Sequence, residues 1–353
     1  MYKELTHQSN NIVIIGMAVA LFLVAIIKLP VGLGHVRDFY LGLSQLGILV
    51  VFAVVLFSIN KWAGMFLILA IVSSSVPMLT FESQRALKCV VYGLGWYYFV
   101  SVYANKKLMM DVMCVIAFAH LMATCVQFFH IPSIFTGRVV GLTANPNEGA
   151  AMFALCFPAF LRYGRVRYLP MIPVGLFMMG SFGGVLAVVA GITFYLCVVG
   201  YYVYVIPAIV LMLLFIVFVH KPTAGMRLDA WENSFKMYLH TWKFGYGLGH
   251  WETISRELVK ANIHLSHETT RAWPRLHNTF LNALVEMGIG FAVIVSGYLI
   301  DTARKFTKDN LIPFTALIVI LVCCSTNSMF RINAINGMLA ITWLAILQRG
   351  VTR

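Results

Sequence analysis

The chain has 353 residues, of which 60% are hydrophobic and only 11% are charged, and its mean hydropathy is +0.85. Soluble domains carry about a quarter charged residues, so this composition excludes an ordinary soluble fold and indicates a protein whose solvent is lipid. The formal net charge is +13, but the basic residues lie mainly in short gaps between apolar runs, and no nucleic-acid-binding motif is present. We therefore expect membrane lipids, and not nucleic acid, as their partners.

Twelve apolar segments, most of them close to the roughly 20 residues that cross a bilayer as a helix, follow one another along the chain. They predict an all-α polytopic membrane protein with a single domain, residues 1–353, and one larger loop, residues 221–276, between the ninth and tenth segments. The stretch 167–220 can be divided in more than one way, because its first segment is short. The segments are residues 11–29, 39–60, 62–80, 87–104, 108–130, 148–163, 168–180, 181–200, 201–220, 277–299, 311–327 and 331–348.

The distribution of Lys and Arg predicts how these segments are oriented. With the N-terminus in the cytoplasm, twelve basic residues fall in the inner connections and six in the short outer ones. We therefore expect both termini in the cytoplasm and loop 221–276 on the outer side of the membrane. The eight basic residues of that loop depart from the preference of Lys and Arg for the cytoplasmic side, and we expect a functional reason for them. The twelve inner residues are Lys3, Lys61, Lys106, Lys107, Arg162, Arg165, Arg167, Arg304, Lys305, Lys308, Arg349 and Arg353.

Three polar clusters interrupt the apolar pattern, and all three fall on the outer side in this orientation. The first, residues 137–153 (GRVVGLTANPNEGAAMF), joins the fifth and sixth segments. Asn147 and Glu148 suit a helix start, as the N-cap and as an acid in the first turn. Arg138 has no such explanation, because it is a lone cation in an outer connection.

The second cluster, GMRLDAWENSF, follows the ninth segment, contains Arg227 and Trp231, and begins a helix-like stretch. Arginine presents a planar fork of donors that matches phosphate oxygens, so Arg138 and Arg227 together would suit a pyrophosphate. Lipid headgroups, or an ion pair with Asp229 or Glu232, would explain Arg227 without any catalytic role.

The third cluster, residues 275–291 (RLHNTFLNALVEMGIGF), opens the tenth segment. A histidine at its outer end, His277, suits proton transfer near neutral pH, and the alternative is an interfacial histidine with no role. Glu286 lies deeper in the same segment, where an acid either serves the function or pairs with a neighbouring helix.

Neither a metal nor a cofactor is predicted. His264 and His267 lack the H-E-x-x-H spacing of a helical zinc site, and no D-x-D cluster lies on a loop. The seven cysteines all fall inside apolar runs, with neither zinc spacing nor a disulfide pattern. Because no strand precedes Gly245, Gly247 and Gly249, we expect these glycines to shape a turn and not a dinucleotide loop.

Taken together, the order and spacing of the three clusters resemble the O-antigen ligase and O-antigen (repeat-unit) polymerase superfamily of membrane glycosyltransferases. The resemblance extends over residues 137–291, and the first five apolar segments match in hydropathy alone. The matching residues are Arg138, Gly141 and Asn145-Pro146-Asn147, then Arg227, Trp231, Gly247 and Gly249, then His277, Asn278, Leu281, Glu286 and Gly288.

The resemblance implies a GT-C-like, metal-independent and inverting glycosyltransferase of the bacterial inner membrane. Its donor would be a glycan on undecaprenyl pyrophosphate, used at the periplasmic face. A glycan or a lipid core would be the acceptor, and a chain-length regulator would be a further partner. His277 would be the base that activates the acceptor hydroxyl. The pyrophosphate would be bound by Arg138, Arg227 and Arg275, with support from Asn147, Asn278, Glu286 and Trp231.

In one place the chain departs from the family pattern. Members often carry Ser-Arg-Gly at the start of the eighth span, where this chain has Ser181-Phe182-Gly183. The missing arginine is either structural in the relatives or replaced here by Arg271, Arg275 or Arg331.

The acceptor also stays open, among a repeat-unit polymerase, a ligase to lipid A–core and a protein O-oligosaccharyltransferase. The short chain, without a soluble C-terminal domain, favours the polymerase. The rival class is a twelve-span transporter, which predicts repeat symmetry and polar residues near the middle of the membrane. A non-catalytic carrier of lipid-linked glycan is a third alternative.

Overall fold

The computed structural model describes residues 49, 51–75, 81–130, 139–143, 145–162, 168–207, 209–210, 231–232, 234–239, 241–251, 253–254, 277–326 and 334–351. The chain divides into two units, Met1–Ile68 and Leu69–Arg353. In the first unit, the helical residues 51–59 end at Asn60, whose side chain accepts the backbone N–H of Trp62 at 2.9 Å. This bond caps α3 (Lys61–Ser75) at the predicted boundary between the second and third apolar segments.

The second unit is built from helices, and its described residues contain no strand. The helices coincide with predicted apolar segments, which confirms the all-α fold class. Segment 11–29 and most of segment 201–220 lie outside the described residues. The helices are α4 (Phe81–Val102), α5 (Lys106–His130), α6 (Pro146–Arg162), α7 (Met171–Met179), α8 (Phe182–Val199), η2 (Tyr202–Tyr204), α12 (Thr279–Met287), α13 (Ile289–Ala303), η3 (Lys308–Asn310), α14 (Leu311–Thr326) and α16 (Ala334–Val351).

The prediction of one continuous span over residues 277–299 is wrong. The chain breaks at Gly288, which has φ +68° and ψ −160°, a conformation that is essentially restricted to glycine. The segment therefore becomes two helices, the short α12 and the longer α13, which continues to Ala303. Breaks of this kind in apolar helices are tolerated where other backbone groups satisfy the freed N–H and C=O groups.

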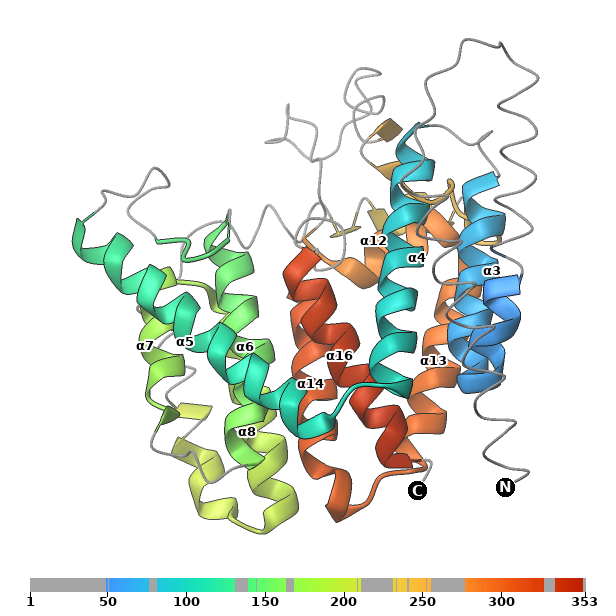
Figure 1. Cartoon of the computed structure of the whole chain (residues 1–353). Coiled ribbons are helices and arrows are strands. Elements are labelled where there is room, and N and C mark those ends of the chain that lie inside the picture. The colour runs from blue at the N-terminus through green and yellow to red at the C-terminus, as the bar shows by residue number, and fades with distance from the viewer. Residues whose placement is uncertain are drawn as a thin grey trace, which may run out of the picture. The chain divides into compact units, whose positions relative to one another are not determined.

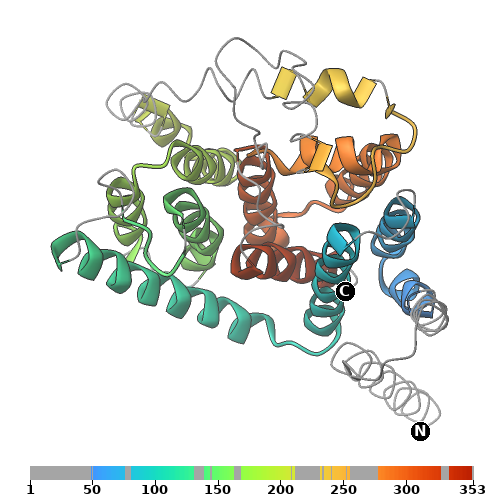
Figure 2. The same cartoon turned by 90° about the horizontal axis from the view of Figure 1, so that it is seen from above.

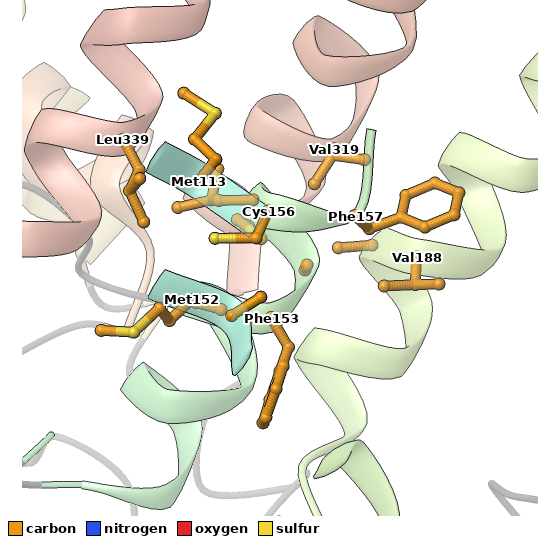
Figure 3. Packing of buried hydrophobic residues seen from close by; sticks show 14 of the residues in the cluster. Met113, Met152, Phe153, Cys156, Phe157, Val188, Val319 and Leu339 are labelled. Carbon is orange, nitrogen blue, oxygen red and sulfur yellow. The ribbon is translucent and has the colours of Figure 1, made fainter. Parts of the chain in front are cut away.

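Helix α6 forms the centre of the second unit. Residues 149–160 are buried without exception, because α5, α7, α8, α14 and α16 all pack against this helix (Figure 2). Small side chains on α6 allow close approach, and larger ones interdigitate with the surrounding helices. Figure 3 shows Phe153 and Phe157 of α6 among Met113 from α5, Val188 from α8 and Val319 from α14.

Two side-chain hydrogen bonds tie α16 to α6. The Trp343 indole N–H donates to the Leu155 carbonyl at 2.7 Å, in the turn that Pro158 weakens by lacking a backbone N–H. The Asn336 amide donates to the Glu148 carbonyl at 2.8 Å, in the first turn of α6. The Trp343 bond is buried and the Asn336 bond is partly buried, and each satisfies polar groups that lipid or apolar side chains leave unpaired.

Helix α5 is apolar on two opposite sides, which is the pattern of a helix in lipid. One side, with Met113 and Ala117, packs on the core, while the other carries a row of exposed apolar side chains at helical spacing. That row consists of Leu108, Val112, Val115, Phe118, Met122 and Val126.

Three described helical segments are long and apolar enough to cross a membrane, namely Lys106–Phe129, Phe182–Val199 and Lys308–Thr326. Two shorter apolar helices, Lys61–Ser74 and Ile289–Ala303, accompany them. These segments are compatible with a membrane protein. The predicted total of twelve spans goes beyond them and stays a prediction.

Candidate functional site

Several of the predicted site residues lie at one end of the second unit, where α12 is found and where α6 and α16 begin (Figure 1). The hydrogen bond between Asn336 and the Glu148 carbonyl joins the first turns of α16 and α6 at this end. Phe280, in the first turn of α12, packs against the core that surrounds α6. The helix that follows His277 and the Asn145-Pro146-Asn147 loop are therefore at the same end.

His277 has an unusual backbone. Its φ is +50°, and it is the only described residue other than glycine with a positive φ. The next residue, Asn278, is the N-cap of α12, since its side-chain oxygen accepts the Leu281 N–H at 3.0 Å. His277 thus stands half-buried and two residues before the helix, whereas the predicted tenth segment begins at His277 itself. Strained residues of this kind concentrate at functional sites.

Glu286 lies in the last turn of α12 and is buried, with 4% of its surface exposed. Its carboxylate accepts the backbone N–H of Trp251 at 3.1 Å. Its carbonyl oxygen accepts the Gly247 N–H at 2.9 Å and the Ser73 hydroxyl at 2.9 Å. Glu286 therefore holds the glycine turn of residues 245–249. The two sequence alternatives for Glu286, a functional acid or a partner of a neighbouring helix, both stay predictions.

The glycine turn lies directly against the break between α12 and α13. Gly245, Gly247 and Gly249 all have positive φ, so the prediction that they shape a turn is confirmed. A Cβ atom on Gly245 would lie 2.5 Å from the Glu286 carbonyl, and one on Gly288 would lie 2.7 Å from the Lys243 oxygen. The two backbones approach closely because neither residue carries a side chain.

Apolar contacts reinforce this junction. Met237, Tyr238 and Trp251 pack with Val285 of α12 in one buried cluster, joined by Leu281 and Leu284 from the same helix. Tyr246 and Ile254 also pack against this cluster, so these parts of segment 231–254 rest on α12, and we name the described residues of this segment the docked segment. Its first residue is Trp231, half-buried, from the predicted second cluster.

Glu232 forms an exposed ion pair with Lys236, 2.7 Å between carboxylate oxygen and ammonium nitrogen. The hydrogen bond to Lys236 and its positive charge lower the pKa of Glu232. Because both groups are exposed, this pair adds little to stability.

Removing the Glu286 carboxylate is expected to loosen the docked segment. In Glu286→Leu the Trp251 N–H loses its acceptor inside a buried region, which costs about 1–3 kcal/mol. Glu286→Gln keeps an acceptor oxygen and serves as the matched control. Hydrogen exchange of peptides covering residues 246–254 should be faster in Glu286→Leu than in Glu286→Gln, and equal exchange in both would contradict the anchoring role.

The predicted N-cap of the sixth segment is off by two residues. Asn145 caps α6, because its side-chain oxygen accepts the Asn147 N–H at 2.8 Å and its carbonyl accepts the Gly149 N–H at 3.0 Å. Pro146 takes the first helical position, where its missing N–H costs nothing. Asn147 lies within the first turn, together with Glu148 as predicted.

At the departure from the family pattern, Ser181 and Phe182 form the junction between α7 and α8. Gly180 ends α7 with φ +55°, and α8 begins at Phe182, whose side chain is 43% exposed. The Ser181 hydroxyl is buried and makes no hydrogen bond to any residue that the structure describes. Gly184, one turn further, packs against Ala150 of α6, which places this junction at the same end as the N-cap of α6.

His277 and Asn278 lie at the start of α12, and Glu286 lies in its last turn, against the glycine turn. Asn147 lies in the first turn of α6. Trp231 is the first residue of the docked segment. Arg138, Arg227 and Arg275 lie outside the described residues, as do Arg271 and Arg331. Sequence reasoning missed Ser73, His120 and Gln127. Of these, His120 and Gln127 are polar residues inside an apolar helix, and that feature was a signal available in the sequence.

Among the described residues, no group of three or more His, Cys, Asp or Glu side chains is arranged to hold a metal ion. The seven cysteines are free thiols. Comparison of the chain with protein-family models and with curated proteins finds no match in either case.

Proposed function

We propose that the protein is a metal-independent, inverting glycosyltransferase of the GT-C type in the bacterial inner membrane. It moves a glycan from undecaprenyl pyrophosphate to an acceptor hydroxyl at the periplasmic face, as a repeat-unit polymerase. The observation that carries the proposal is the setting of His277. It is the one described non-glycine residue with a strained backbone, at the start of the helix on which the docked segment rests.

In the proposed reaction His277 acts as the general base. It takes the proton of the acceptor hydroxyl, whose oxygen attacks the anomeric carbon of the donor sugar from the side opposite the pyrophosphate. The bond between the anomeric carbon and the phosphate oxygen breaks, and its electron pair leaves on undecaprenyl pyrophosphate. The proton on His277 then passes to solvent, and the configuration at the anomeric carbon is inverted.

Arg138 and Arg227, with Arg275, are proposed to bind the pyrophosphate. Fixed cations stabilise the negative charge that develops on the leaving group, which is the task that Mg²⁺ has in metal-dependent enzymes. Arg138 directly precedes the described loop at residues 139–143, and Arg227 precedes the docked segment by four residues. Asn278 supports His277 as the cap of α12, and Glu286 supports it by holding the glycine turn.

The charges at the other end of the second unit support the proposed orientation. There α5 begins, α13 is followed by η3 and α14, and α16 ends (Figure 1). The Arg349 guanidinium donates to the carbonyls of Val102 and Ala104 at the end of α4. Basic residues gather in cytoplasmic connections, so we assign this end to the cytoplasm and the His277 end to the periplasm. The basic residues are Lys106, Lys107, Arg304, Lys305, Lys308 and Arg349.

The arginine assignment is tested by transfer from a purified lipid-linked donor in the presence of EDTA. Arg138→Ala and Arg227→Ala should each lower the rate about 10- to 100-fold, because each removes one cation from the leaving group. Arg304→Ala, at the opposite end, is the control and should keep the wild-type rate. Full activity in either of the first two variants would remove the pyrophosphate assignment, and loss of wild-type activity with EDTA would remove the metal-free mechanism.

The acceptor is decided by the surface glycan of a strain that lacks the gene. A polymerase deletion should leave single repeat units on the lipid core. Polymer that accumulates on the lipid carrier would instead indicate a ligase to lipid A–core, and loss of glycan from proteins alone would indicate a protein O-oligosaccharyltransferase.

A further inference from the structure

Gln127, near the end of α5, binds one loop through both the oxygen and the nitrogen of its side-chain amide. Its oxygen accepts the N–H groups of Val140 at 3.0 Å and Gly141 at 2.8 Å, and its nitrogen donates to the Gly141 carbonyl at 2.8 Å. Three hydrogen bonds from one side chain to two consecutive residues fix the backbone of the loop in place. A polar amide in an otherwise apolar helix is costly unless it is satisfied in this way.

His120 lies two turns earlier on the same face of α5, and it binds the next residue of the same loop, Leu142. Its Nδ1 accepts the Leu142 N–H at 3.0 Å, and its Nε2 faces the Gly149 carbonyl at 3.1 Å. Because one nitrogen accepts and the other must donate, the ring is neutral and carries its proton on Nε2. The ring is fully buried and packs against Phe153 of α6, with 4.6 Å between ring centroids.

The loop fits this surface closely. Gly141 has φ +62°, and a Cβ atom there would lie 2.3 Å from Cε1 of His120 and 2.8 Å from the Thr124 hydroxyl. The backbone therefore lies directly against the Cε1–Nδ1 edge of the imidazole ring, which gives a physical reason for glycine at this position. The loop at residues 139–143 is shaped by α5, through side chains that belong to none of the three sequence clusters.

We propose that His120 and Gln127 are positioning residues for the donor, which rests on the proposed function. Gln127 holds Val140 and Gly141, and His120 holds Leu142; Arg138 precedes Val140 by two residues in the sequence. A displacement of Val140 and Gly141 is passed to the cation that binds the pyrophosphate. Neither side chain takes part in the reaction, so the expected effect is on donor binding and not on proton transfer.

The test uses full-length protein in detergent and compares Gln127→Leu with Gln127→Glu. The leucine variant loses all three hydrogen bonds, whereas the glutamate variant keeps an acceptor for both N–H groups. We expect Gln127→Leu to raise the KM for the lipid-linked donor about tenfold, while kcat and the KM for the acceptor stay nearly unchanged. Gln127→Glu should fall between wild type and Gln127→Leu. Val126→Leu, at an exposed neighbouring position, is the control with an unchanged donor KM.

Hydrogen exchange of a peptide covering residues 139–145 supplies a readout that needs no activity. Exchange there should be faster in Gln127→Leu, with the same midpoint of thermal unfolding as wild type. Faster exchange with an unchanged donor KM overturns the positioning role alone. An equal rise in both KM values, with a lower unfolding midpoint, overturns it as well. A wild-type protein that transfers no glycan from the lipid-linked donor overturns the proposed function, and this proposal with it.

Discussion

Glycan transfer is expected to fall by about 10²- to 10⁴-fold in His277→Asn, the range that the loss of a general base causes. Asparagine is the informative substitution because His277 has φ +50°, a backbone conformation that asparagine adopts readily and alanine does not. The variant therefore removes the proton acceptor and keeps the turn into α12. Its unfolding midpoint in detergent should equal that of wild type, whereas His277→Ala should be less stable.

The measurement is single-turnover transfer from a purified lipid-linked donor, together with thermal unfolding. His267→Asn, at a histidine of the predicted loop 221–276 that lies outside the three clusters, is the matched control and should keep wild-type transfer. A folded His277→Asn protein with wild-type transfer would refute the role of His277 as the base. A transporter or a passive carrier of lipid-linked glycan would also tolerate this substitution, so the result separates the classes of function.

Gly288→Ala is expected to disrupt the candidate site by straining the backbone between α12 and α13. The conformation of Gly288, with φ +68° and ψ −160°, costs about 1–3 kcal/mol for a residue with a side chain. In addition, the new Cβ would lie 2.7 Å from the Lys243 carbonyl, which belongs to the backbone and cannot rotate away. Relief requires the glycine turn to move from the end of α12. We therefore expect a lower unfolding midpoint, and a large loss of transfer because α12 and the docked segment no longer fit.

Gly95→Ala is the control for that experiment. Gly95 lies inside α4, and a Cβ atom there would meet nothing within 4 Å. Alanine is the better helix former, so this variant should be as stable as wild type or slightly more stable. If Gly288→Ala behaved like Gly95→Ala in both measurements, the close contact between the two backbones would have no energetic importance.

Hydropathy predicted the described helices well, because a long apolar run in lipid satisfies its backbone hydrogen bonds only as a helix. The predicted first and last residues of the helices were less accurate where capping or a close backbone contact determined them. Asn145 caps α6 in place of Asn147, since Pro146 is suited to the first helical position and moves the cap outward. The break at Gly288 was missed because its cause is the Lys243 backbone, which lies 45 residues away in the sequence and close in space.

Some features of the candidate site could be predicted from the sequence and others could not. His277 and the glycine turn could be found from residue types and spacing. The role of Glu286 could not, because the Trp251 N–H that it accepts is backbone and leaves no mark in the sequence. His120 and Gln127 carried a visible signal as polar residues in an apolar helix, but the loop they hold becomes apparent only when α5 is placed beside α6.

The complete burial of α6 has a consequence for how the protein is assembled during synthesis. This helix leaves the ribosome before four of the five helices that cover it, and α14 and α16 follow it by about 150 residues or more. Between Glu148 and Arg162 the helix α6 carries no charged residue. Lipid can therefore cover its apolar surface until the later helices have been made and pack against it. Docking of α16 on α6 then exchanges lipid for the Trp343 and Asn336 hydrogen bonds, so α6 is fully covered only after α16 has been made.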